Sequence, residues 1–122
     1  MNQQQQLPKI GFIGLGAMGA PMARNVAAGG YALTVLDADA GMTRKVAADI
    51  GATPAASAAE VGARSDIVVT MLPTSRIVET VLFGADGLAA SLKPGSIVVE
   101  MSSGAPSRTR AIAVRLAALD IA

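Results

Sequence analysis

The sequence contains no cysteine, no histidine and no tryptophan, and aromatic residues make up only 2% of its 122 positions. The lack of cysteine excludes disulfide bonds, thiol catalysis and thiolate metal sites, and a zinc site would need carboxylates alone. We therefore expect no metal site. With so few aromatic side chains, the core must be built from Ala, Val, Ile, Leu and Met, which suits helices of small residues packed closely on a sheet.

An excess of charge and long apolar runs are also missing. Ten basic residues are balanced by nine acidic ones, and dispersed charge of this kind argues against a nucleic-acid partner. The N-terminus lacks the basic and apolar segments of a signal peptide, and no run of about 18 apolar residues occurs. We expect a soluble, cytoplasmic protein without membrane contact, with a disordered tail at residues 1–8 and one domain at 9–122.

A glycine-rich turn is present between an apolar strand and a helical segment. Residues 10–19 read Ile-Gly-Phe-Ile-Gly-Leu-Gly-Ala-Met-Gly, with glycines at 14, 16 and 19. A turn without side chains lets the backbone approach a ligand, and the N–H groups at the start of the next helix favour a phosphate. Gly19 is expected to let this helix pack closely on the strand. Because the chain has 13 glycines, the motif alone is weak evidence for a dinucleotide site.

Predicted strands alternate with predicted helices along the chain. Turn residues and hydrophobic periodicity predict strands at residues 9–13, 31–36, 53–55, 66–72 and 96–100. Helices are predicted at 17–28, 41–50, 57–63, 88–92 and 106–118, and from Thr74 or Ser75 onward with an apolar face of Ile77, Val78, Val81 and Leu82. This alternation predicts an α/β fold with a doubly wound parallel sheet, the Rossmann dinucleotide-binding fold, whose ligands bind at the carboxyl ends of the strands.

Candidate site residues follow four of these strands, which strengthens the glycine motif. Asp37 ends the second strand, where a carboxylate accepts hydrogen bonds from the adenosine ribose and repels a 2′-phosphate, so NAD is favoured over NADP. Arg44 lies seven residues further on, within possible reach of such a phosphate, so NADP stays open. The alternative role for Asp37 is to cap the next helix.

Residues after the later strands are further candidates for structural or binding roles. Pro73 ends its strand, and its loop borders any bound cofactor. Ser102 and Ser103 either cap the helix that begins near Pro106, or form hydrogen bonds with the nicotinamide end or the substrate. Met18 and Met22 are expected in the core, with a place near the pyrophosphate turn as the alternative for Met18.

Three motifs in order resemble the β-hydroxyacid dehydrogenases, a family that includes 3-hydroxyisobutyrate dehydrogenase and tartronate semialdehyde reductase and is related to 6-phosphogluconate dehydrogenase. They are Gly-Phe-Ile-Gly-Leu-Gly-Ala-Met-Gly-Ala-Pro-Met at 11–22, Thr-Met-Leu-Pro-Thr-Ser at 70–75, and Glu-Met-Ser-Ser at 100–103 followed by Pro106. The resemblance covers residues 9–122. It implies that pyrophosphate binds at Gly14, Leu15, Gly16, Ala17 and Met18, next to Gly19, and that Asp37 meets the adenosine ribose. It also implies that Met71, Leu72 and Pro73 line the dinucleotide, that Ser103 lies by the nicotinamide, and that Ser102 faces the substrate.

The chain departs from the family pattern in two ways. Glu100 stands where aspartate is usual, and the family's last strand, substrate loop and all-helical domain with the catalytic lysine would lie beyond Ala122. Lys9, Lys45 and Lys93 match no catalytic lysine motif, so no catalytic residue is assigned. The resemblance implies hydride transfer between nicotinamide and a small hydroxyacid or semialdehyde in the intact enzyme.

For the chain alone we expect NAD(H) binding with negligible turnover. We also expect self-association, because the apolar strand at residues 96–100 would form an exposed edge of the sheet. Two alternatives stay open. One is an NADPH-dependent aldehyde or imine reductase of the same fold, and the other is a stand-alone dinucleotide-binding module.

Overall fold

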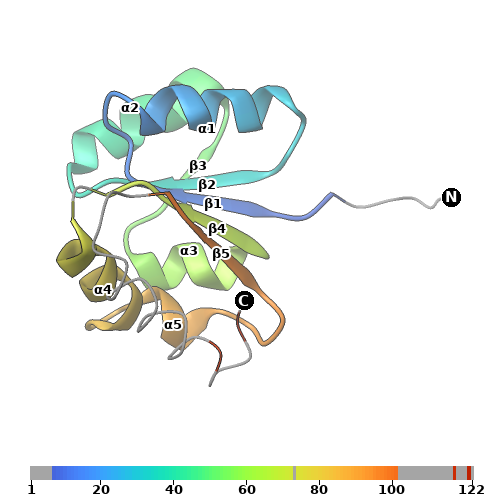
Figure 1. The fold of residues 1–122 in the computed structure, drawn as a ribbon. Coiled ribbons are helices and arrows are strands. Elements are labelled where there is room, and N and C mark those ends of the chain that lie inside the picture. Colours follow the sequence, from blue (N-terminus) through green and yellow to red (C-terminus); the bar gives the residue numbers. More distant parts are fainter. Residues whose placement is uncertain (1–6, 73, 102–116, 118–120, 122) are drawn as a thin grey trace, which may run out of the picture.

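The structure, a computed structural model, describes residues 7–72, 74–101, 117 and 121 (Figure 1). Strands alternate with helices through this part of the chain, as predicted. The strands are β1 (Ile10–Ile13), β2 (Leu33–Leu36), β3 (Thr53–Pro54), β4 (Ile67–Thr70) and β5 (Ile97–Glu100). The helices are α1 (Gly19–Ala28), α2 (Ala40–Ile50), α3 (Ala58–Arg64), α4 (Ser75–Phe83) and α5 (Leu88–Ser91).

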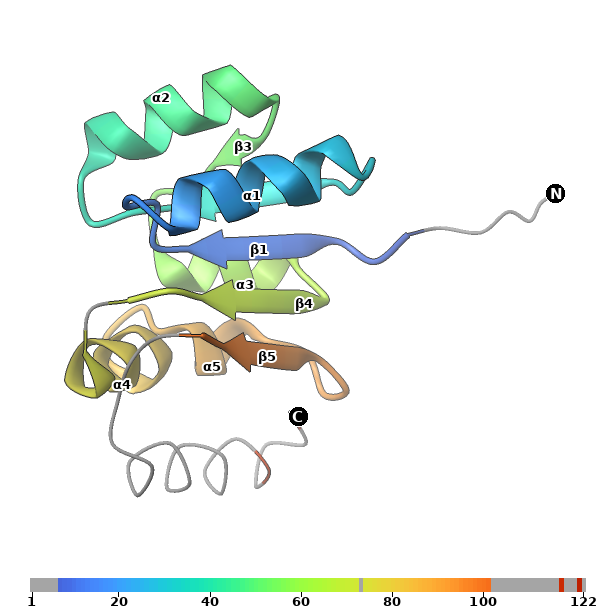
Figure 2. The same cartoon turned by 45° about the horizontal axis from the view of Figure 1, so that its top comes forward.

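The strands form one parallel sheet in the order β3-β2-β1-β4-β5. Helices α1 and α2 cover one face, and α3, α4 and α5 cover the other (Figures 1 and 2). The chain moves outward from β1 through β2 to β3, then returns to the other side of β1 to add β4 and β5. This reversal opens a crevice at the carboxyl ends of β1 and β4, where such sheets bind their ligands. The predicted doubly wound parallel sheet is confirmed.

Strand β1 is buried on both faces and separates two apolar cores. Ile10 and Phe12 pack with residues of α1 and α2, whereas Ile13 packs with residues of α3, α4 and α5. Gly11 faces α3 so closely that a Cβ there would lie 2.6 Å from Ser65 Oγ. Burial on both faces explains why β1 reads as an unbroken apolar run rather than an alternating pattern.

Several element boundaries differ from the prediction by one or two residues, and one helix face also differs. Strand β2 begins at Leu33 rather than residue 31, because Gly30, with φ +90°, turns the chain and leaves Tyr31 exposed. Helix α1 begins at Gly19 rather than residue 17. The predicted apolar face of α4 was wrong at Ile77, whose side chain is 39% exposed, whereas Val78 and Leu82 are completely buried.

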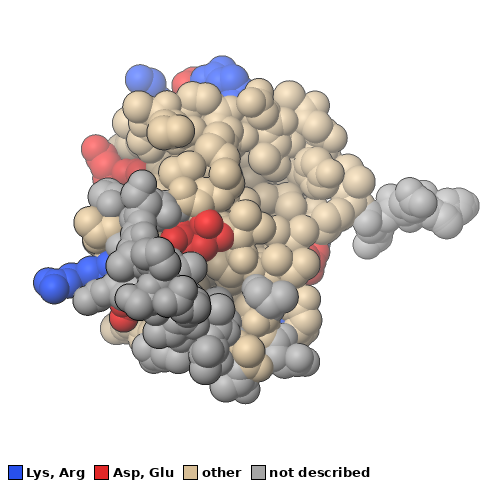
Figure 3. Space-filling model, in the orientation of Figure 1, with Lys and Arg blue, Asp and Glu red and all other residues tan. Residues whose placement is uncertain are grey.

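The surface of the described residues carries scattered charges, as Figure 3 shows for one face. In the described part of the chain, β5 pairs only with β4, and its Ile97 and Val99 are exposed. Among the same residues, no helix is long and apolar enough to span a membrane. The predicted tail up to residue 6, Pro73, the serines at 102 and 103, and nearly all of the helix predicted at 106–118 lie outside the described residues.

Candidate functional site

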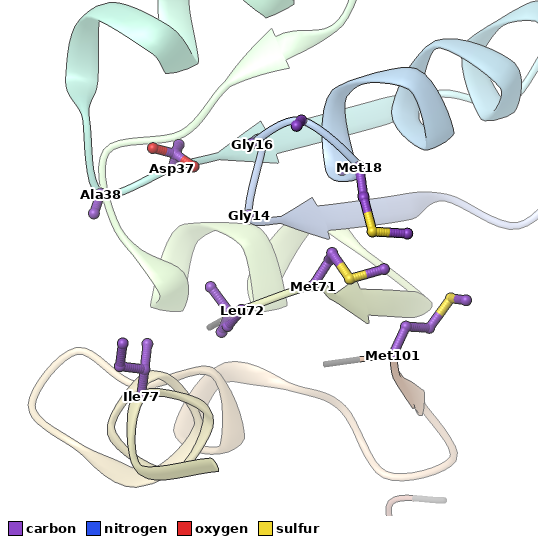
Figure 4. A pocket seen from close by; sticks show the side chains of 11 residues that line it. Gly14, Gly16, Met18, Asp37, Ala38, Met71, Leu72, Ile77 and Met101 are labelled. Carbon is purple, nitrogen blue, oxygen red and sulfur yellow. The ribbon is translucent and has the colours of Figure 1, made fainter. Parts of the chain in front are cut away.

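A cavity of about 590 Å³ opens at the carboxyl ends of β1, β2, β4 and β5. Its size is within the range of small-molecule sites. Loops that are far apart in sequence meet around it (Figure 4). The lining residues are Gly14, Gly16, Ala17, Met18, Gly19, Asp37, Ala38, Met71, Leu72, Ile77 and Met101.

The three glycines of the turn after β1 meet different surroundings. Gly14 has φ +104°, and a Cβ there would collide with the backbone carbonyl of Met71. A Cβ on Gly19 would collide with the carbonyl of Gly14, so the start of α1 lies directly against the turn. At Gly16 a Cβ would meet nothing within 4 Å, although the residue lines the cavity. Packing within the chain therefore requires Gly14 and Gly19, whereas Gly16 keeps the cavity open.

The N-terminus of α1 has no cap of its own. Met18 holds the N-cap position without a side-chain hydrogen bond, and the first turn contains no acidic residue. Within the described residues, the N–H groups of Gly16, Ala17 and Met18 donate to no acceptor. Unpaired N–H groups together with the positive end of the helix dipole favour an anion. The turn therefore presents the donors that a phosphate needs.

Asp37 joins this turn to the turn after β2. The Asp37 carboxylate accepts a hydrogen bond from Leu15 N–H through Oδ1 at 2.8 Å and from Asp39 N–H through Oδ2 at 3.0 Å. A carboxylate has about four acceptor positions, so two remain for other donors such as ribose hydroxyls. The alternative role of Asp37 as a helix cap was wrong, because Asp39 caps α2 by accepting from Gly41 N–H and Met42 N–H.

Apolar side chains complete the cavity on either side of the glycine turn. Met18, Met71 and Met101 lie on one side of the turn, and Ala38 lies with Asp37 on the other (Figure 4). The expectation that Met18 is a core residue was wrong, since its side chain is 67% exposed. Met22, by contrast, packs against the core beneath α1 as expected.

Sequence reasoning missed three lining residues, Ala38, Ile77 and Met101. Two of them directly follow a residue already singled out, since Ala38 follows Asp37 and Met101 follows Glu100. Their position at the ends of β2 and β5 was therefore a usable signal. The sequence contains no comparable signal for Ile77, because helical periodicity predicted that it lies in the core.

The remaining predicted residues fall outside the cavity lining or outside the description. Leu15 does not line the cavity, since its side chain is 1% exposed in the core beneath α1 and α2 and its N–H is bonded to Asp37. Pro73, Ser102 and Ser103 lie outside the described residues, so their roles stay predictions. Among the described residues, no group of three or more acidic side chains is placed to hold a metal ion.

A second cavity of about 380 Å³ adjoins the first at the end of β2. Both cavities are lined by Asp37 and Ala38, and the second is also lined by Thr43 and Arg44. Arg44 therefore lines the same cavity as Asp37, the residue whose carboxylate is expected to bind the adenosine ribose.

The strand order, the uncapped glycine turn and the acidic residue at the end of β2 define a dinucleotide-binding domain of the Rossmann type. Residues 9–122 match the family model described as the NAD binding domain of 6-phosphogluconate dehydrogenase. The chain belongs to this family of NAD-binding domains.

Several named dehydrogenases and reductases are similar to the chain. It is 42% identical over 100 residues to 3-sulfolactaldehyde reductase of Escherichia coli, covering 82% of this chain and 33% of the relative. It is 44% identical over 107 residues to NAD-dependent L-serine dehydrogenase of Pseudomonas aeruginosa, covering 87% and 35%. A crystal structure of 3-hydroxyisobutyrate dehydrogenase from Salmonella typhimurium is 33% identical, with a TM-score of 0.85 over 93% of this chain and 39% of that one. The chain thus spans about a third of the length of the curated relatives that it matches.

Proposed function

We propose that the chain forms the cofactor-binding part of an NAD-dependent oxidoreductase acting on a small hydroxyacid or the corresponding aldehyde. One observation carries the proposal: the unpaired N–H groups of the Gly16 turn and the Asp37 carboxylate line one cavity at the switch point of the sheet. The names of two curated relatives, 3-sulfolactaldehyde reductase and NAD-dependent L-serine dehydrogenase, support the substrate class, since one names an aldehyde and the other an amino acid that carries a 3-hydroxyl group. A bound nicotinamide would supply the hydride-transfer chemistry.

We expect the two sides of the cavity to bind different parts of the dinucleotide. The N–H groups of residues 16–18 bind the pyrophosphate, and Asp37 accepts hydrogen bonds from the adenosine ribose. Because Asp37 lies on one side of the glycine turn, the nicotinamide half extends to the other side, toward Met71 and Met101 (Figure 4). The predicted roles of Ser102 and Ser103 belong to that half.

Arg44 keeps NADP open as a second cofactor. Its side chain lines the cavity next to Asp37, where a 2′-phosphate on the adenosine ribose would be directed. Asp37 repels such a phosphate, whereas Arg44 attracts it, so the two side chains have opposite effects. We expect the carboxylate to dominate, because its Oδ1 is fixed by Leu15 N–H, and NADH to bind more tightly than NADPH.

Titration calorimetry with NADH and NADPH tests this proposal on the wild-type chain and on Gly16→Ala. The added Cβ meets no protein atom but projects toward the cavity, so we expect a stable variant with roughly tenfold weaker NADH binding. Gly30→Ala, at an exposed turn outside the lining, is the control and should retain wild-type affinity. Wild-type protein without affinity for either nucleotide would overturn the proposal, and tighter NADPH binding would overturn the preference for NAD.

We expect the chain alone to turn over no substrate. A general acid or base has to reach the substrate oxygen, and none of the three lysines lines the cavity. Lys9 precedes β1 and thus lies at the opposite edge of the sheet from the glycine turn. Robust hydride transfer by the chain, followed as NADH absorbance with small hydroxyacids, would contradict this expectation.

Self-association is the last part of the proposal. The side chains of Ile97 and Val99 on β5 are exposed, and apolar strand edges favour pairing with another chain. We expect the sedimentation coefficient of the purified chain to rise with concentration.

A further inference from the structure

The Asp37 carboxylate contacts the phosphate-binding turn as well as its own loop. Its Oδ1 accepts the hydrogen bond from Leu15 N–H, which belongs to the middle of the glycine turn and is 22 residues away in sequence. Leu15 itself is anchored in the core with 1% of its surface exposed. The bond therefore fixes the direction of the peptide unit between Gly14 and Leu15, one residue before Gly16.

Thr43 in turn fixes Asp37. The Thr43 hydroxyl accepts from Asp37 N–H at 2.8 Å and lies 3.2 Å from the carbonyl oxygen of Asp37 and 3.1 Å from that of Asp39. Thr43 is only 3% exposed, in the first turns of α2. Its hydroxyl thus holds the backbone of the turn that carries the carboxylate, and Thr43 lines the adjoining second cavity but not the main one.

From these contacts we infer that Asp37 serves the pyrophosphate subsite as well as the ribose subsite. It braces the glycine turn through Leu15, and Thr43 is a positioning residue for this brace. The inference rests on the proposed function and goes beyond it, because ribose recognition alone requires no contact between Asp37 and the glycine turn. It also means that removing Asp37 disturbs two subsites at once.

A ligand without ribose hydroxyls separates the two roles. In 2′,3′-dideoxy-ADP the adenine and pyrophosphate are retained, but the carboxylate has no hydroxyl to bind, whereas ADP offers both. If Asp37 acts only on the ribose, Asp37→Asn should leave dideoxy-ADP binding unchanged or make it tighter, because a negative charge near the phosphates is removed. If Asp37 braces the turn, the variant should bind dideoxy-ADP more weakly. Only the second role therefore predicts a loss of dideoxy-ADP affinity.

Titration calorimetry on the full chain supplies this test. For Asp37→Asn we expect dideoxy-ADP to bind at least roughly threefold more weakly. The asparagine side chain has one carbonyl oxygen, so it can accept from Leu15 N–H or from Asp39 N–H, and its NH2 group can accept from neither. Unchanged or tighter binding of dideoxy-ADP together with a loss of ADP affinity would overturn the inference. Wild-type protein that binds neither ADP nor NADH would instead overturn the proposed function, and this inference with it.

Thr43 variants provide the second, independent arm. Thr43→Val removes the hydroxyl and should weaken ADP and dideoxy-ADP by a similar factor, roughly two- to threefold, and Thr43→Ser should restore wild-type binding. Thr80→Val is the matched control, since the Thr80 hydroxyl donates to Arg76 C=O within α4 and Thr80 does not line the cavity. Hydrogen exchange at the Leu15 amide should accelerate in Thr43→Val and Asp37→Asn but not in Thr80→Val. Wild-type exchange at Leu15 in both brace variants would overturn the inference.

Discussion

In the described part of the chain, four helices begin after a parallel strand, at the same edge of the sheet, yet their first turns differ. The N-cap residues of α2, α3 and α4 are Asp39, Ser57 and Thr74, and the side chain of each accepts a hydrogen bond from an N–H group of its own helix. The N-cap residue of α1 is Met18, whose side chain accepts none. A cap of this kind stabilises a helix by about 1 kcal/mol, so α1 forgoes stability that its neighbours have. The free N–H groups of residues 16–18, just before this helix, are left for a ligand, and this marks the phosphate site more sharply than the glycines alone.

The glycine turn is tightly packed, so Gly14→Ala should have the largest effect on the free energy of unfolding. The new Cβ would collide with the carbonyl of Met71, and the residue has φ +104°. We expect the free energy of unfolding to fall by more than about 3 kcal/mol in urea denaturation. Gly30→Ala is the control, with φ +90° but nothing within 4 Å of its Cβ, and should cost only about 1–2 kcal/mol. Equal losses would show that conformation, not close packing, explains Gly14.

A negative charge added at the start of α1 tests whether this helix N-terminus binds phosphate. In Met18→Asp, a carboxylate at the helix N-terminus should stabilise the fold by about 0.3–1 kcal/mol. It should also repel the pyrophosphate, so that NADH binds at least roughly tenfold more weakly in calorimetry. Met18→Leu keeps an apolar side chain at this exposed position and serves as the control, with affinity close to that of the wild type. NADH affinity retained in Met18→Asp would show that the α1 terminus does not bind phosphate.

The capped helices were the most predictable part of the fold, because their signals are local. The pattern Ser57-x-x-Glu60 predicts the start of α3, and Gly51, with φ +73°, ends α2. One contact differs from the usual capping box, in which the glutamate accepts a hydrogen bond from the N–H of the capping serine. Ser57 accepts from Glu60 N–H, but Glu60 Oε1 accepts from Ala56 N–H rather than from the serine. Sequence spacing locates the capping residues, whereas the partner of a flexible side chain depends on the path of the preceding turn.

The candidate site was predictable where its residues follow strands directly. The glycine turn and Asp37 could be placed together because the carboxyl ends of parallel strands share one edge. Ile77 could not, since two neighbouring apolar residues on α4 read alike in sequence. Val78 turns into the core and Ile77 into the cavity, and only the packing of α4 on the sheet decides between them. The bond from Leu15 to Asp37 is likewise a product of tertiary packing.

Removing a cap from α4 should have the smallest effect and separates stability from binding. Thr74 Oγ1 accepts from Ile77 N–H at 3.2 Å, so Thr74→Ala should lower the free energy of unfolding by about 1 kcal/mol, and Thr74→Ser should restore it. NADH affinity should stay within about twofold of the wild type, because this helix terminus uses its donor internally. A loss of affinity larger than the loss of stability would mean that the α4 terminus also contacts the cofactor. In that case the N-termini of α1 and α4 would both contribute to one anion site, and they would differ only in how strongly each binds.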